Sequence, residues 1–92
     1  MVARRVQAIA LPAQPFSLAN LREVSNALYG PIWAVFLAED LGVKPRTIKG
    51  WFNGKPLPDL RQQLAALCRK RGAGQPGMEQ LARKIEELGP PE

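Results

Sequence analysis

The chain has 92 residues, with 13 lysines and arginines, eight aspartates and glutamates, and no histidine. The missing histidine removes the commonest general base and metal ligand, and the single cysteine, Cys68, has no partner for an internal disulfide. We therefore expect no enzyme, no metal site and no cofactor, and no apolar run is long enough for a membrane span.

The net charge of +5 is concentrated in the middle of the sequence. Residues 44–74 hold eight lysines and arginines against one acid, whereas residues 1–43 have no net charge and residues 75–92 are net negative. A basic segment of this kind is the electrostatic footprint of a protein that binds a polyanion. A solvated basic surface is the alternative that charge alone leaves open.

The first sixteen residues show no helical spacing of apolar side chains. Their start resembles a secretion signal only faintly, because its apolar part is short and is interrupted by Gln7 and Pro12. We interpret residues 1–16 as a partly disordered arm. Arg4 and Arg5 could reach a DNA minor groove, but an arm without this role is the favoured interpretation.

Two helices are predicted between residues 17 and 42. Ser17 is a good N-cap for the first helix, which ends at Gly30-Pro31 because proline cannot continue it. The second helix begins at Pro31 and ends at Gly42, a natural C-terminal stop. Its expected inward side consists of Trp33, Phe36, Leu37 and Leu41.

The segment PRTIKGWFNG predicts a third, short helix. Pro45 suits the first helical position, and Lys44 is pushed out of helical geometry because it precedes a proline, so residues 42–44 form a three-residue turn. On a helical wheel the apolar side chains share one side, where we expect them to pack in the core. These are Ile48, Trp51 and Phe52, and the opposite side carries Arg46, Lys49, Gly50 and Asn53.

Two further helices are predicted in the last third of the chain. LPDLRQQLAALCRKRG favours a fourth helix, in which Cys68 lies on the apolar stripe and is expected to be buried. GAGQPG is interpreted as a flexible joint before a fifth helix in MEQLARKIEEL. The apolar stripe of this last helix packs either on its own domain or on a second copy of the chain.

Two short helices joined by a three-residue turn with glycine have the geometry of a helix-turn-helix. The stretch FLAEDLGVKPRTIKGWFNG resembles this motif in the Cro/C1-type (lambda-repressor-like) repressors. The resemblance covers about residues 17–71, and WFNG is similar to the way several such repressors end the helix that reads DNA. Where this family often has Ser, Thr or Gln, the chain has Lys44-Pro45, and Ala34 replaces a polar residue.

The side chains opposite the apolar face have the chemistry for reading DNA. Arginine and lysine can pair with the acceptors of guanine, and threonine can contact phosphate or a thymine methyl group. The resemblance implies that Lys44, Arg46, Thr47 and Lys49 meet bases or adjacent phosphates and that Asn53 meets the backbone. Our predicted DNA-binding residues are Lys44, Arg46, Thr47, Lys49, Gly50, Asn53 and Lys55.

Some of these assignments have open alternatives. Gly50 either allows close approach to DNA or is only a tolerated weakness in the helix. Lys55 is expected to meet a phosphate, and Arg61 is a weaker candidate. The run Arg69-Lys70-Arg71 is interpreted as a charge cluster at the C-terminal end of a helix rather than as a DNA contact.

Together these patterns predict an all-α fold, a small five-helix bundle that contains a helix-turn-helix. The expected organisation is an arm (1–16), a DNA-binding domain (17–72) and a linker with a C-terminal helix (73–92). We expect a cytoplasmic, nucleoid-associated homodimer, a sequence-specific regulator that represses transcription by inserting residues 45–53 into the major groove of double-stranded DNA. The alternatives are an antitoxin-like autoregulator whose C-terminal helix binds a protein partner, and a protein-interaction module that uses the basic face.

Overall fold

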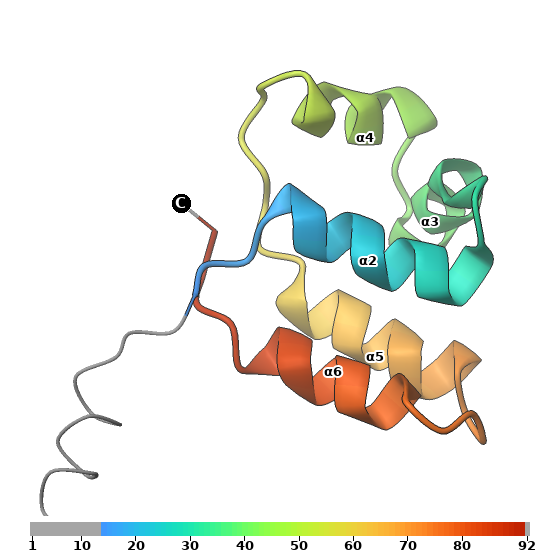
Figure 1. The fold of residues 1–92 in the computed structure, drawn as a ribbon. Coiled ribbons are helices and arrows are strands. Elements are labelled where there is room, and N and C mark those ends of the chain that lie inside the picture. The colour runs from blue at the N-terminus through green and yellow to red at the C-terminus, as the bar shows by residue number, and fades with distance from the viewer. Residues whose placement is uncertain (1–13, 92) are drawn as a thin grey trace, which may run out of the picture.

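The computed structural model describes residues 14–91, and over this range the chain is helical (Figure 1). The predicted all-α fold is confirmed, because the range contains five helices and, apart from an isolated bridge between Pro15 and Gly89, no strand. None of these helices is long and apolar enough to cross a membrane. Arg4 and Arg5 lie outside the described residues. The helices are α2 (Leu18–Tyr29), α3 (Trp33–Leu41), α4 (Pro45–Phe52), α5 (Arg61–Arg71) and α6 (Met78–Glu86).

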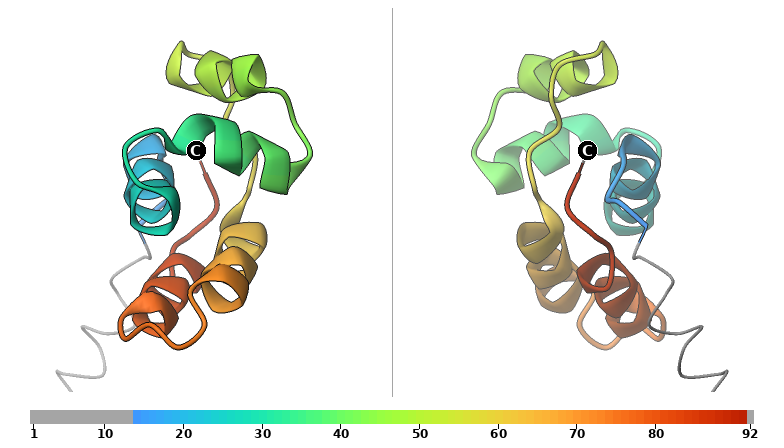
Figure 2. Two further views of the ribbon diagram at one scale, coloured as in Figure 1. Left: turned by 90° about the vertical axis from the view of Figure 1, so that its right-hand side faces the viewer. Right: turned by 90° about the vertical axis from the view of Figure 1, so that its left-hand side faces the viewer.

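Helix α2 occupies the middle of the molecule (Figure 1). Helices α5 and α6 pack side by side on one side of α2, and α3 crosses its C-terminal end. Figure 2 shows in both views that α4 lies at the end of the molecule opposite the α5–α6 pair. The short helix α4 therefore has one face toward the other helices and an outer face that no other element covers.

One continuous core joins the helices. It includes side chains from every helix and also Phe16, which is 2% exposed and precedes α2. Ile48 and Trp51 are buried as predicted, and Phe52 is half-buried at the edge of this core. The buried apolar residues are Phe16, Leu21, Val24, Leu37, Ala38, Ile48, Trp51, Leu60, Leu64, Ala65, Cys68, Ala82 and Ile85.

Phe36 is the exception to the predicted core. Its side chain is 47% exposed, because α3 turns Leu37 and Ala38 inward instead. One side of the Phe36 ring stacks on Tyr29 at the end of α2, with 6.1 Å between ring centroids. The prediction that Phe36 packs inside was therefore wrong.

The helix ends follow local hydrogen bonding. Ser17 is the N-cap of α2, and Asn20 Oδ1 accepts hydrogen bonds from the Ser17 backbone N–H and hydroxyl, each at 2.9 Å. Helix α3 begins two residues later than predicted, at Trp33. Helix α5 begins at Arg61 rather than near residue 57, and the Asp59 carboxylate accepts the Arg61 backbone N–H at 3.2 Å.

Helix α6 packs on its own domain. Ala82 and Ile85 have no exposed surface and pack in the core with α5. Arg69 of α5 donates to the carboxylates of Glu79 and Glu86 at 2.7–3.0 Å. The sequence left open whether the apolar stripe of α6 packs on its own domain or on a second copy of the chain. In the structure it packs on α5 of the same chain.

The turn between α5 and α6 depends on Gly72, the first residue of GAGQPG. Gly72 is buried, and its carbonyl accepts the Gln75 N–H at 2.9 Å. A Cβ atom on Gly72 would lie 2.1 Å from Met78 Cγ and 2.6 Å from the Cys68 carbonyl oxygen. The first turn of α6 therefore packs against a position that has no room for a side chain.

Gly72→Ala is expected to destabilise the fold by about 1–2 kcal/mol, because the added methyl group forces α5 and α6 apart. Chemical unfolding followed by circular dichroism measures this loss. Gly50→Ala is the matched control, since a Cβ at Gly50 would meet only the flexible side chain of Lys55 and alanine favours the helix. An equal loss in both variants would contradict the packing argument.

A hydrogen-bonded cluster ties α2, α3 and α5 together near their ends. The Tyr29 hydroxyl donates to Asp40, and Arg71 donates to both oxygens of the same carboxylate, at 2.6 Å to Oδ1. The Asp40 side chain is only 13% exposed, and the Arg71 guanidinium lies 5.8 Å from the centre of the Tyr29 ring. The hydrogen bonds from Arg71 hold the pKa of Asp40 below its ordinary value, although burial opposes the shift.

We expect acid to remove the stabilisation that Asp40 provides. The pKa of Asp40 is lower in the folded than in the unfolded state. Its contribution to stability is therefore complete above about pH 5 and is lost as the pH falls through the folded pKa. Asp40→Asn should therefore lower the free energy of unfolding by about 1 kcal/mol at neutral pH, and it should weaken the acid dependence of stability. The loss stays near this value because Arg71 is exposed to solvent, which screens the ion pair. Unfolding curves of both proteins between neutral and acidic pH test this. Parallel pH profiles would contradict it.

Candidate nucleic-acid interface

The turn before α4 fixes how this helix is presented. Gly42 ends α3 with a left-handed backbone (φ 72°, ψ 28°), and Lys44 is extended (φ −85°, ψ 149°), as expected for a residue before proline. Pro45 occupies the first turn of α4. Since Ile48 is 2% and Trp51 8% exposed, their side of α4 is held inside and the opposite side faces outward.

The outward side of α4 and its flanking residues carry the predicted DNA-binding side chains. The structure places six of the seven predicted residues on the exposed surface over a stretch of twelve positions. Four of the six are cations, and the other two offer a hydroxyl and an amide. The exposed residues are Lys44, Arg46, Thr47, Lys49, Asn53 and Lys55.

Gly50, the seventh predicted residue, lies under the side chain of Lys55. A Cβ atom on Gly50 would be 3.1 Å from Lys55 Cδ and 3.7 Å from Cε. The Gly50 carbonyl also accepts the backbone N–H groups of Asn53 and Lys55, each at 3.0 Å. Gly50 thus lets the chain after α4 fold back and lay the Lys55 stem across the helix.

Ion pairing divides the basic segment into two groups. Three of its arginines contact acidic side chains, and all three belong to α5. Their pairs are Arg61–Asp59, Arg69–Glu79, Arg69–Glu86 and Arg71–Asp40. Among residues 14–91 no acid pairs with the four cations at α4. The positive charge of residues 44–74 that no acid neutralises therefore lies mainly at α4. Lys70 on α5 is the one exception in this segment.

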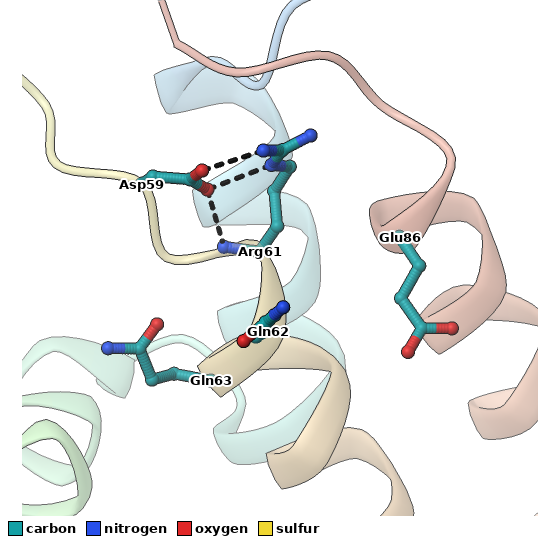
Figure 3. A pocket seen from close by; sticks show the side chains of 5 residues that line it. All are labelled: Asp59, Arg61, Gln62, Gln63 and Glu86. Atoms are coloured by element: carbon teal, nitrogen blue, oxygen red, sulfur yellow. Dashed lines mark hydrogen bonds and ion pairs between the residues drawn. The ribbon is translucent and has the colours of Figure 1, made fainter.

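Arg61 is used inside the protein. Figure 3 shows its guanidinium facing the Asp59 carboxylate in a two-point contact, with N···O distances of 2.8 and 2.7 Å. Its third nitrogen donates to the Leu88 carbonyl at 2.6 Å and so fastens the segment after α6. The contact with Arg61 also lowers the pKa of Asp59. The sequence-based assignment of Arg61 as a weaker DNA contact has no support in this arrangement.

An open groove beside α4 brings in a cation that the sequence did not single out. The Arg22 guanidinium of α2 lies 5.1 Å from the centre of the Phe52 ring, and Trp33 packs against the same ring at 5.8 Å. The groove has a volume of about 540 Å³. Its walls are Arg22, Trp33, Ala34, Pro45, Arg46, Ile48, Lys49 and Phe52.

Arg22, Arg46 and Lys49 therefore surround a mostly apolar surface. Arg22 was not among the predicted site residues, because its neighbour Phe52 is 30 positions further along the chain. Such a surface can accept an anionic group at its rim and an apolar edge, such as a methyl group or a sugar, at its floor.

Two further observations concern metal ligands and the cysteine in the described part of the chain. No group of three or more His, Cys, Asp or Glu side chains is gathered there for a metal ion. Cys68 is buried, and this burial raises the pKa of its thiol, which opposes formation of the nucleophilic thiolate. Comparisons with protein-family models, curated proteins and solved structures gave no match.

Proposed function

We propose that this protein is a sequence-specific, double-stranded DNA-binding transcriptional regulator and that α3, the turn and α4 act as its helix-turn-helix. The observation that carries the proposal is the outward face of α4, where exposed cations that have no acidic partner among residues 14–91 lie opposite the buried Ile48 and Trp51. A short helix of about 10–12 Å diameter fits the major groove of B-form DNA, which is about 12 Å wide. The resemblance to Cro/C1-type repressors favours repression and a cytoplasmic location.

Each side chain has a role that its position supports. Arg46 and Lys49 project from the first two turns of α4 and are the candidates for base edges. Lys44, Asn53 and Lys55 flank the helix, where they suit phosphates on the two sides of the groove. Arg22 adds a further cation on the side of the α2–α4 groove.

Selection of bound sequences from a random duplex pool tests the proposal. We expect a defined sequence to be enriched and its binding to weaken steeply with salt. For several phosphate contacts the loss is roughly 10³-fold between about 50 and 200 mM salt. Recovery of no preferred sequence, with salt-sensitive binding to acidic proteins instead, would favour a protein-interaction module and contradict the proposal.

A further inference from the structure

The outward face of α3 is apolar. Ile32, at the start of the helix, is 72% exposed, Val35 59% and Phe36 47%. Among residues 14–91 these three are the exposed large apolar side chains. Spacings of three and four residues bring them together on one side of the helix. Single exposed apolar residues are ordinary, but a contiguous patch marks an interaction surface.

The order of residues along this face is self-complementary. At about 100° per residue, Glu39 shares the face with Ile32, Val35 and Phe36. In an antiparallel pair of α3 helices with a two-fold axis between Val35 and Phe36, each Val35 meets Phe36 of the second copy. The same axis places each Ile32 opposite Glu39 of the second copy, as an isologous contact requires.

The charges also favour a second copy as the occupant of this patch. No side chain caps the start of α3, and its first turn holds no acid, so no side chain in that turn neutralises the positive end of the helix. Glu39 is exposed and makes no ion pair within the described range. Antiparallel pairing brings Glu39 of each copy to the positive end of the other helix. The cationic face of α4, by contrast, would repel its own copy.

We propose that two copies of this chain associate through the outward faces of their α3 helices, antiparallel about a two-fold axis between Val35 and Phe36. The patch is separate from the outward face of α4, so the dimer forms without DNA. It also gives each dimer two copies of α4, as a two-fold symmetric DNA site requires.

Sedimentation velocity of the full chain without DNA, from low micromolar to submillimolar concentration, tests the association. We expect a monomer–dimer equilibrium in the wild type. Ile32→Glu should raise the dimer dissociation constant by about tenfold or more, because it opposes Glu39 of the second copy. Val35→Asp, which places a charge beside the axis, should weaken association to a similar extent.

A charge exchange tests the antiparallel register. Adding Glu39→Lys to Ile32→Glu should restore association, because each new pair of opposite charges joins two copies. Within one chain the two positions are about 10 Å apart along the helix, so the rescue cannot arise there. Gln80→Glu adds the same charge to the exposed surface of α6 and should leave association unchanged.

Three results would overturn the proposal: a wild type that stays monomeric, a dimer that tolerates Ile32→Glu and Val35→Asp, or a charge exchange that fails to restore association. Circular dichroism confirms that each variant is folded, which the exposure of Ile32 and Val35 leads us to expect. Since no DNA is present, the outcome is independent of the proposed DNA binding.

Discussion

Trp51→Ala is expected to destabilise the fold by about 3–5 kcal/mol. Helix α4 has eight residues, which is too short for a stable isolated helix, so its structure depends on packing. Trp51 and Ile48 are its two buried residues, and Trp51 is the larger. Removing the indole leaves a cavity and loosens α4 from the rest of the core. Thermal and chemical unfolding, followed by circular dichroism, measure the loss.

Trp51→Phe is the graded control for this prediction. A phenyl ring keeps an aromatic side chain in the same site, so the loss should be markedly smaller than for alanine. If Trp51→Ala were as stable as the wild type but no longer bound DNA, the indole would contact DNA directly. The assignment of Trp51 to the core would then be wrong.

The elements of the fold were predictable because local signals mark them. Pro45 fixes the start of α4, Lys44 is extended because it precedes proline, and Gly42 takes the left-handed conformation that ends α3. The apolar positions Ile48 and Trp51 then determine which face is inward. These signals act over one or two helical turns. The local amino-acid sequence is therefore sufficient to predict which face of α4 is exposed as the candidate DNA-binding face.

Properties that depend on distant neighbours were not predictable in the same way. Phe36 lies outside because α3 packs through Leu37 and Ala38, and helical spacing alone does not determine which part of an apolar stripe is buried. Arg69 and Arg71 carry the same charge as the cations of α4. They differ from that group because they pair with acidic side chains from other helices. The proximity of Arg22 to Phe52 is likewise a contact between separate helices.

This division of the charges determines how DNA binding should respond to mutation. Arg46→Ala and Lys49→Ala should each weaken binding to the selected DNA sequence by about 1–3 kcal/mol, which is roughly 5- to 150-fold, and relax the preference at one base position. Both side chains are exposed on α4 and lie opposite its buried face. Titration of labelled duplexes at fixed salt measures the affinity, and a repeated selection measures the preference.

Lys70→Ala is the matched control. Lys70 is an exposed cation that makes no ion pair among residues 14–91, but it lies in the last turn of α5 rather than on α4. Its removal changes the net charge by the same amount as Arg46→Ala or Lys49→Ala. It should nevertheless alter affinity by no more than about twofold at physiological salt, because charges beyond about 8 Å are screened. Equal losses in all three variants would show that net charge alone drives binding. If Arg46→Ala and Lys49→Ala bound as the wild type does, the outward face of α4 would not be the DNA-binding surface.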